Sequence, residues 1–412
     1  MKDFTDVAII GAGPYGLSLA AHLRETGLSF RIFGEPLNTW RKHMPEGMFL
    51  KSDGFASNLS APVPDGTLKS YCAQHDLAYR DTGLPVPLDV FNAYAEAFQR
   101  RFVPNVEAKN VLVLERKGAD FVLTLETGEK VVARHVVLAV GITHFANMPE
   151  ELKHIPKDFR THSFHHCDTG QFYRREVVVI GGGASAMDIA TQLADGGASV
   201  SIVAREKKIR WHNPPVARHM FSWLTRPSTG IGPGWRSLFC VKLPQLFRVL
   251  PEALRLRIVR RHLGPAPGWF ARARVEERIP ILLDVELAGA SLRNHRVGLV
   301  LTSGGEEQEI LCDHVIAATG YKPDLSRLSF MDLRLLREIK QVDDTPVLSG
   351  RFETSVRGLY VVGPAAANSF GPMMRFMFGA QYASPLLAQH LKHRLKRSLR
   401  ATPLPRQTFR PA

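Results

Sequence analysis

Residues 6–16 read DVAIIGAGPYG, and this stretch decides the fold of the chain. A short apolar run ends at a glycine-rich turn, helix-forming residues follow at 17–25, and a second apolar run stands at 30–33. This order predicts a β-α-β unit, because two parallel strands of one sheet need a helix as their crossover.

The turn has the G-x-G-x-x-G spacing of a dinucleotide-binding loop. The first glycine permits a tight turn, the second lets a pyrophosphate approach the backbone, and the third lets the helix pack closely on the strand. Free N–H groups at the start of the helix attract the phosphates. The expected dinucleotide contacts are Gly11, Gly13, Pro14 and Gly16. Glu35, at the end of the second strand, is expected to bind ribose hydroxyls; the alternative is an ordinary surface glutamate.

A second copy of the pattern begins about 170 positions later. Strand, turn, helix and strand follow one another over residues 177–203, and the turn reads GGGASA at 181–186, the G-x-G-x-x-A variant. Two copies this far apart indicate two nucleotide-binding domains. The expected contacts in the second are Gly181, Gly183, Ser185 and Ala186.

The residue that follows the second strand of each unit distinguishes the two domains. Arg205 stands 24 positions after Gly181, the same spacing that separates Glu35 from Gly11. An acid repels a 2′-phosphate, whereas a guanidinium binds it. The second domain is therefore predicted to prefer NADPH, the alternative being an exposed basic loop. One dinucleotide must then be a redox centre that stays bound, which favours FAD in the first domain.

The predicted fold class is α/β, with two Rossmann-type dinucleotide-binding domains, the NADPH domain inserted in the FAD domain, and a helical insertion. The predicted boundaries are 1–168 for the first part of the FAD domain, 169–309 for the NADPH domain with its insertion at about 206–280, 310–400 for the second part of the FAD domain, and 401–412 for a basic tail.

Composition limits the class of protein. The net charge of +14 comes from 53 Lys and Arg against 39 Asp and Glu, and four cysteines are present without any C-x-x-C pair. A redox-active dithiol of close spacing is thus excluded. The basic excess fits a solvated face and anionic cofactors, and no nucleic-acid partner is expected. No signal peptide or long apolar segment stands out, which favours a cytoplasmic location.

The two turns, together with AATGYKPD at 317–324, resemble the class B flavoprotein monooxygenases, which include flavin-containing, Baeyer–Villiger and lysine/ornithine N-hydroxylating enzymes. VLAVG at 137–141 and GLYVVG at 358–363 are similar to further FAD-domain segments of that family. The resemblance implies that Gly141, Gly320 and Gly363 contact a cofactor. The Baeyer–Villiger fingerprint F-x-G-x-x-x-H-x-x-x-W is absent.

Further residues are singled out near the reacting atoms. MFLKSDGFASNL at 48–59 is similar to the F-L-K-D-L stretch of N-hydroxylating enzymes, which implies a site role for Lys51. Trp40 resembles the tryptophan of their G-G-x-W stretch. The last helix is expected to begin near Pro372 and to point its N-terminus at the flavin. The expected catalytic residues are Lys51, Asn58 and Arg375, and no metal site is expected.

Residues 211–270 combine arginines with large aromatic side chains. They fit a helical lid over the flavin, or else a helical subdomain with its own core, a weak membrane-surface contact or a dimer contact.

The function expected from these features is that of an NADPH-dependent FAD monooxygenase. It would transfer one oxygen atom from O₂, through a C4a-(hydro)peroxyflavin, to a small organic substrate such as a urate-like heterocycle or an amine. Some bacterial FAD-dependent urate hydroxylases have this general shape. Two alternatives stay open: an NADPH:electron-carrier reductase of the ferredoxin type, and a non-catalytic nucleotide-binding redox regulator.

Overall fold

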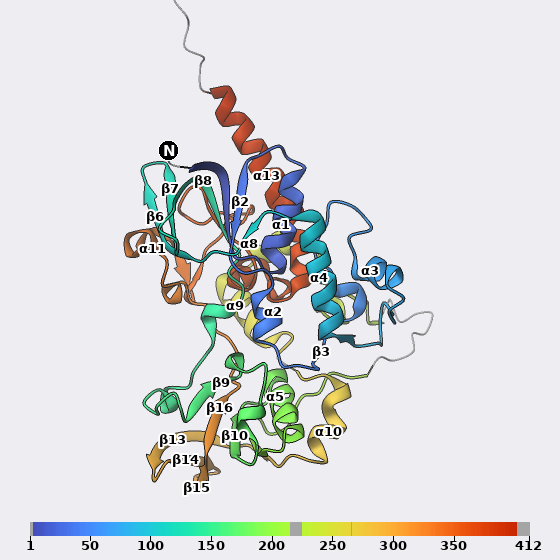
Figure 1. Ribbon diagram of the computed structural model, residues 1–412, viewed down its shortest axis with the longest axis vertical. Helices are drawn as coiled ribbons and strands as arrows, with labels where there is room; N and C mark the ends of the chain where they lie inside the picture. Colours follow the sequence, from blue (N-terminus) through green and yellow to red (C-terminus); the bar gives the residue numbers. More distant parts are fainter. Residues whose placement is uncertain (1–2, 215–224, 265, 402–412) are drawn as a thin grey trace, which may run out of the picture.

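The computed structural model describes residues 3–214, 225–264 and 266–401. Two lobes lie along the long axis of the molecule, and the first lobe carries both the amino-terminal strand and the last helix (Figure 1). None of the helices in the described ranges is long and apolar enough to cross a membrane. The predicted basic tail, except for Ala401, lies outside the described residues.

The first lobe is built on a sheet whose strands come from distant parts of the chain. β8 at its centre has β1 on one side; on the other side, its first half pairs with β7 and its second half with β19. The sheet order is β5 (Val106–Glu107), β2 (Phe30–Phe33), β1 (Asp3–Ile10), β8 (Lys130–Leu138), β7 (Asp120–Leu125) and β6 (Val111–Lys117), with β19 (Leu359–Val361) beside β8. Strands β5, β2, β1, β8 and β19 are parallel, so their carboxyl ends share one edge.

Helix α1 (Pro14–Arg24) packs between this sheet and the last helix, α13 (Ala380–Ala401). Most of α1 is buried, because α4 (Leu88–Phe102) also contacts it. The shorter elements of this lobe are α2 (Asn38–Lys42), β3 (Phe49–Leu50), η1 (Gly54–Ala56), α3 (Leu68–Gln74), β4 (Val86–Pro87), η2 (Thr143–Phe145), η7 (Leu325–Arg327), α11 (Leu333–Glu338), β17 (Gln341–Val342), β18 (Thr345–Pro346), η8 (Pro364–Ala366) and α12 (Ala367–Phe370).

The second lobe has a five-stranded parallel sheet. Its order is β12 (Ile281–Leu283), β11 (Ser199–Ala204), β10 (Glu176–Ile180), β16 (His314–Ala317) and β9 (Arg160–His162). The central strand alternates: Val177 and Val179 pack toward α5 (Ala184–Asp195), whereas Val178 and Ile180 pack toward the antiparallel sheet of β13 (Glu286–Arg293), β14 (Arg296–Ser303) and β15 (Glu306–Cys312). This period of two is typical of a strand buried on both faces.

The fold therefore confirms the predicted pair of Rossmann-type units, one inserted in the other, but the limits of the second unit differ from the predicted ones. β9 precedes the predicted boundary at 168/169, and β16 follows the one at 309/310. Each of these strands extends the second sheet in parallel register. The reason is hydrogen bonding: His314–Ala317 pairs with β10, which leaves that buried strand without an open edge.

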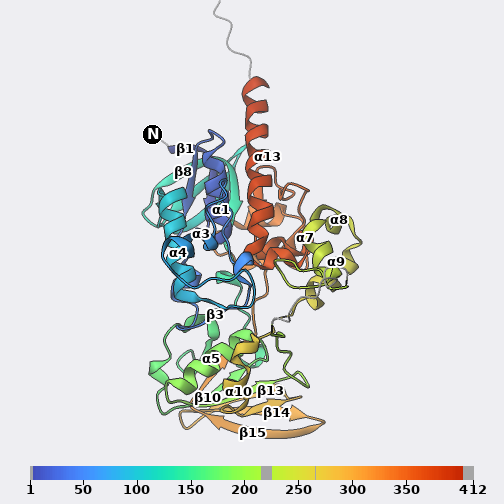
Figure 2. The same ribbon diagram turned by 90° about the vertical axis from the view of Figure 1, so that its right-hand side faces the viewer.

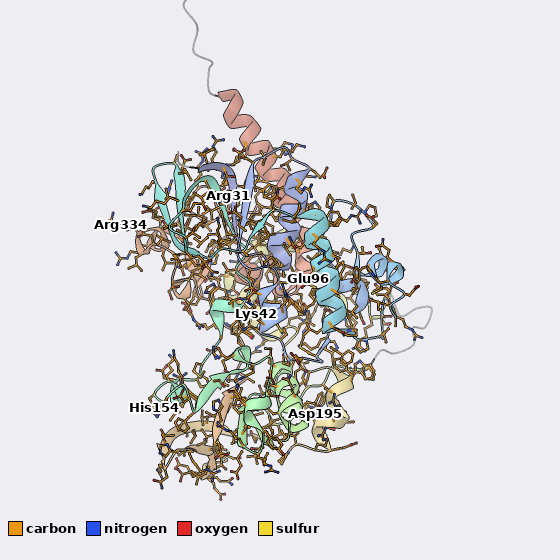
Figure 3. All side chains as sticks on the ribbon, in the orientation of Figure 1. Arg31, Lys42, Glu96, His154, Asp195 and Arg334 are labelled. Atoms are coloured by element: carbon orange, nitrogen blue, oxygen red, sulfur yellow. The ribbon has the colours of Figure 1, made fainter. Side chains whose placement is uncertain are left out.

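The predicted insertion at 206–280 is divided between the lobes. α7 (Trp235–Lys242), α8 (Pro244–Val249) and α9 (Glu252–Arg261) lie beside the first lobe (Figure 2), and Phe247 and Val259 are buried in the core of that lobe. These helices therefore do not form a subdomain with its own core; they share the core of the first lobe. η6 (Trp269–Ala271) and α10 (Arg272–Glu276) instead lie on the second lobe. There the guanidinium of Arg278 forms an ion pair with Asp195 (labelled in Figure 3) at 2.6 Å. Residues 215–224 lie outside the described ranges.

The last helix begins later than predicted. Two 3₁₀ turns, η9 (Pro372–Arg375) and η10 (Met377–Gly379), come first, and α13 begins at Ala380. The hydroxyl of Tyr15 donates to the carbonyls of Met374, at 3.0 Å, and Phe376, at 2.8 Å. Phe376 itself is extended, at φ −109° and ψ 150°. The bond to a buried side chain from α1 thus stabilises a non-helical entry to α13.

Candidate cofactor cleft and domain interface

The two glycine-rich turns have the same construction. Gly11 has φ +112° and Gly181 has φ +140°, a region that L side chains avoid. A Cβ at either position would also clash with a carbonyl of the neighbouring strand end, that of Ala139 in the first lobe and that of Ala318 in the second. Both first glycines are therefore required by backbone conformation and by close approach, as the spacing predicted.

The other two glycines of the first turn differ in what surrounds them. A Cβ at Gly16 would clash with the carbonyl of Gly11, so the third glycine lets α1 begin against the turn. A Cβ at Gly13 would meet nothing within 4 Å, so this side of the turn faces open space. Pro14 occupies the first turn of α1, where its missing N–H costs nothing. The open side of Gly13 is where a pyrophosphate fits.

A cleft of about 400 Å³ passes over this turn. It joins the carboxyl ends of β1, β2 and β8 to the segment before α13. Of the residues predicted to bind FAD, those that line it are Gly11, Gly13, Pro14, Glu35, Trp40, Gly141 and Gly363. The residues present thus fit a dinucleotide that lies with its ribose near Glu35 and its pyrophosphate over Gly13.

Glu35 and Trp40 have structural partners as well. Glu35 pairs with Lys42 at 2.6 Å, and Figure 3 shows Lys42 on the part of the first lobe that faces the second. The indole of Trp40 packs on Phe91, with ring centroids 4.6 Å apart. Both residues are therefore fixed at the edge of the cleft.

Arg375 lines the far end of the cleft, beside Phe376 and Met377. Its NH2 group donates to the backbone carbonyls of His262, at 2.6 Å, and Leu263, at 3.1 Å. Burial lowers the pKa of the guanidinium. Of the expected catalytic residues, Arg375 is thus placed in the cleft, and the neighbouring Met373 and Met374 are core residues.

Asn58 is not placed there. Its side-chain oxygen accepts from the backbone N–H of Leu68 at 2.7 Å, and its amide donates to the carbonyl of Phe55 at 2.8 Å. These bonds hold the 55–68 loop together, and Asn58 does not line the cleft, so its catalytic role stays a prediction. Gly320 also lies away from the cleft lining: its carbonyl accepts from Asn147 N at 2.9 Å and from His162 Nε2 at 3.1 Å, where the two connections between the lobes run side by side.

Lys51 lies between the lobes rather than in the cleft lining. Its Nζ donates to the carbonyl of Ala266 at 3.3 Å, and nearby Phe49 contacts Phe270 with ring centroids 5.7 Å apart. Lys51 is exposed to solvent, but desolvation by the surrounding protein lowers its pKa, and Asp188 of α5 opposes that shift. Burial likewise raises the pKa of Asp188 to about 6, against the attraction of Lys51. A cation of the first lobe and a carboxyl of the second therefore act on each other across the interface.

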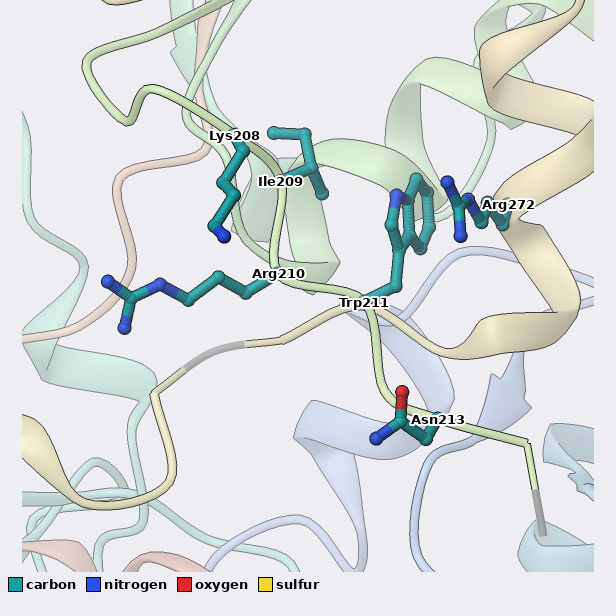
Figure 4. Close-up of a pocket in the computed structure, with 6 residues that line it drawn as sticks. All are labelled: Lys208, Ile209, Arg210, Trp211, Asn213 and Arg272. Atoms are coloured by element: carbon teal, nitrogen blue, oxygen red, sulfur yellow. The ribbon is translucent and has the colours of Figure 1, made fainter. Parts of the chain in front are cut away.

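The second turn is surrounded by charged side chains. Arg205 follows β11 directly, as predicted, and is highly exposed, with its Nε 3.8 Å from Glu206. Gly183 is the N-cap of α5, and Ser185 and Ala186 form its first turn. A shallow pocket of about 550 Å³ lies next to it (Figure 4), lined by Lys208, Ile209, Arg210, Trp211, Asn213 and Arg272. In Figure 4 the side chains of Lys208 and Arg210 extend from the same loop, on the side away from Trp211.

Sequence reasoning missed four residues around this interface. Arg210 and Arg272 add two cations to the pocket, and Asp188 faces Lys51. Glu206 lies over the turn, since a Cβ at Gly182 would come within 2.9 Å of its Oε2. The spacing from Gly181 could have pointed to Glu206, which directly follows Arg205, whereas Arg272 is distant in sequence and left no such signal.

Comparisons with known proteins agree with this architecture. A family model described as pyridine nucleotide-disulphide oxidoreductase matches residues 8–226, just over half of the chain. The solved structure of an ornithine N-hydroxylase from Kutzneria sp. 744 has a TM-score of 0.77 at 16% identity and covers 95% of this chain and 100% of that one. The fold that the class B resemblance implied is thereby confirmed.

Two curated relatives match this chain over only part of their length. A ferredoxin–NADP reductase of Thermus thermophilus is 27% identical over 232 residues, which cover 53% of this chain and 58% of that protein. A FAD-dependent urate hydroxylase of Xanthomonas campestris is 26% identical over 350 residues, covering 79% of this chain and 68% of that protein. The chain thus spans little more than half the length of the Thermus relative.

Proposed function

The chain belongs to the pyridine nucleotide-disulphide oxidoreductase family, and from that premise we propose that it is an NADPH-dependent FAD monooxygenase acting on a small organic substrate. The chemistry that FAD supplies when bound is acceptance of a hydride and activation of O₂. The substrate class that we propose is a urate-like heterocycle or an amine, in keeping with the names of the Xanthomonas and Kutzneria proteins.

The observation that carries this proposal is the apolar wall at the far end of the cleft. Phe376 and Met377 line it, and α7 packs against η9 next to them. Oxygen transfer needs such a wall, because water and uncontrolled protons consume reactive oxygen species before they meet a substrate. The four cysteines are unpaired and offer no close dithiol, so electrons taken from NADPH do not leave through a disulfide of this chain.

The cofactor roles follow from the two turns. Gly11, Gly13 and Pro14 would hold the FAD pyrophosphate, with Glu35 on the ribose. Gly181, Gly183, Ser185 and Ala186 would hold the NADPH pyrophosphate at the start of α5. Arg205, Lys208, Arg210 and Arg272 supply positive charge for a 2′-phosphate, and Glu206 supplies the opposing charge.

We assign Lys51 and Asp188 to the substrate's path between the lobes. Lys51 is expected to orient an anionic or hydrogen-bond-accepting group. A carboxyl with a pKa of about 6 can hold or release a proton near neutral pH, which suits Asp188 to control the protonation of an amine or a heterocycle. A cytoplasmic location stays part of the proposal and rests on the sequence argument.

The competing function is an NADPH:electron-carrier reductase. The name of the Thermus relative and the net charge of +14, which would suit an acidic carrier protein, favour it. It predicts that NADPH oxidation needs a carrier protein instead of O₂.

Rapid mixing of NADPH-reduced protein with oxygenated buffer separates the two functions. A monooxygenase is expected to show a transient absorbance before the spectrum of oxidised flavin returns, and substrate should shorten its lifetime. Direct return of the oxidised spectrum, combined with carrier-dependent NADPH oxidation, would establish the reductase. A purified protein that binds no flavin after reconstitution would overturn both.

A further inference from the structure

Arg375 holds a partly buried positive charge at the far end of the cleft. Among the residues that the structure describes, no carboxylate lies within ion-pair distance of its guanidinium, and Nε is buried without a hydrogen-bond partner. A buried guanidinium is costly unless an anion or several acceptors compensate it. The two backbone carbonyls of 262–263 compensate it in part, so the rest of the charge is available to whatever fills the cleft.

The helical insertion fixes the position of this charge. The two carbonyls belong to His262, the C-cap of α9, and to Leu263. They lie at the negative end of the α9 dipole, which favours a cation. The imidazole of His262 also hydrogen-bonds Ser237 of α7, with Nε2 and Oγ 3.1 Å apart. α9 therefore holds Arg375 through these two carbonyls, and α7 holds His262 in place.

The position of Arg375 along the cleft identifies its ligand. The adenosine half of a dinucleotide would lie by Glu35 and the pyrophosphate over Gly13, so the other half must lie at the opposite end. That end is lined by Gly363, Arg375 and Met377. The ring of FAD is thus the group that this end of the cleft would receive.

Resting on the proposed function, we propose that Arg375 stabilises the negative charge of the reduced flavin, and that the helical insertion α7–α9 serves to position it. A hydride carries two electrons and one proton, so a neutral oxidised ring that accepted one from NADPH would gain one negative charge, with NADP⁺ as the other product. A fixed guanidinium beside that ring binds the reduced form more tightly than the oxidised form. Charge placed near the ring is one of the means by which a protein sets the potential of a flavin.

The test is the midpoint potential of the flavin in the reconstituted holoenzyme, measured against a reference dye. In Arg375→Gln, the reduced flavin should bind about tenfold more weakly relative to the oxidised flavin, which lowers the two-electron potential by about 30 mV. Arg375→Lys keeps the charge but loses the paired carbonyl bonds, so its potential should lie between those of Arg375→Gln and the wild type.

Arg255→Gln is the matched control. Arg255 also joins the insertion to the first lobe through a backbone carbonyl, that of Asn368 at 2.8 Å, and its Nε is also buried without a partner, but it does not line the cleft. Its potential should equal that of the wild type. An unchanged potential in a folded, flavin-loaded Arg375→Gln variant, or an equal fall in Arg255→Gln, would overturn the inference. A wild-type protein that binds no flavin would instead overturn the proposed function.

Discussion

At the scale of single residues, the glycines of the first turn divide into those that the fold needs and one that a ligand needs. Gly11 and Gly16 are held by contacts within the protein, whereas Gly13 faces open space. At the second turn, Arg205 and Glu206 instead bring opposite charges to one site. Substitutions at Gly11 and Gly13 can therefore separate folding from binding, and substitutions at Arg205 and Glu206 can test the charge of the second site.

Gly11→Ala should destabilise the protein by about 2–4 kcal/mol, because alanine would meet both an unfavourable φ and the carbonyl of Ala139. Gly13→Ala should change the free energy of unfolding of the flavin-free protein by less than about 1 kcal/mol but lower its flavin occupancy. Urea unfolding of both apoproteins, with flavin content per chain, checks this. Equal unfolding energies for the two variants would contradict the division.

Arg205→Ala should raise the KM for NADPH about tenfold and the KM for NADH far less, since removal of one charged hydrogen bond to a phosphate costs roughly 1.5 kcal/mol or more. Glu206→Gln, the neighbouring control, should lower the KM for NADPH by relieving repulsion. Steady-state NAD(P)H oxidation measures both effects. Equal changes in the two KM values for Arg205→Ala would remove the assignment of that residue.

At the scale of elements, the strands β9 and β16 close the second sheet at the place where the chain passes between the lobes. Thr161 of β9 bonds His166, with Oγ1 and Nε2 2.6 Å apart, and also His314 of β16, at 2.9 Å. Burial lowers the pKa of His162, His166 and His314 to about 4. These imidazoles are structural, and they are neutral at pH 7.

The free energy of unfolding should therefore fall as pH decreases from about 7 to 4. The unfolded chain takes up protons on these histidines near pH 6.5, whereas the folded protein does so near pH 4, at a cost of up to about 3 kcal/mol for each imidazole. His166→Gln should flatten this dependence, and the exposed His154→Gln (labelled in Figure 3) should not. Urea unfolding at pH 7, 5.5 and 4.5 is the measurement. A slope unaffected by His166→Gln would contradict it.

At the scale of the whole molecule, the predicted insertion contacts both lobes, because α7–α9 pack on the first lobe while η6 and α10 pack on the second. Its outer face has exposed apolar side chains at Leu243, Leu246 and Val249. Arg257 and Arg261 are exposed on the neighbouring α9. An apolar row flanked by cations is typical of a surface that touches an anionic membrane weakly.

Sedimentation with vesicles checks this contact. A small fraction of the protein should sediment with phosphatidylglycerol vesicles at low salt, and little with phosphatidylcholine vesicles or at high salt. Leu246→Glu combined with Val249→Glu should abolish the binding. Leu333→Glu, at another exposed apolar position with 65% exposure, should leave it intact. Binding that survives the double substitution would rule out this face.

Much of the fold and of the cofactor site was predictable because both depend on local rules. The glycine spacing predicts a positive φ angle and a close backbone approach at the first glycine of each turn, and Gly11 and Gly181 have both. Alternating apolar residues likewise reveal strands buried on both faces. The hydrogen bonds of Asn58 to Phe55 and Leu68 could not be predicted, because they depend on a loop conformation that the sequence pattern does not show.

By itself, the sequence determined that this chain folds as two Rossmann-type units with one inside the other, since local spacing specifies each turn. The tertiary structure alone decided that α7–α9 pack on the first lobe, that Arg375 donates to the carbonyls of His262 and Leu263, and that Lys51 and Asp188 interact across the interface. Those pairings join residues separated by more than a hundred positions. They depend on which apolar faces and unpaired charges find one another in the folded chain, and no short-range pattern records that choice.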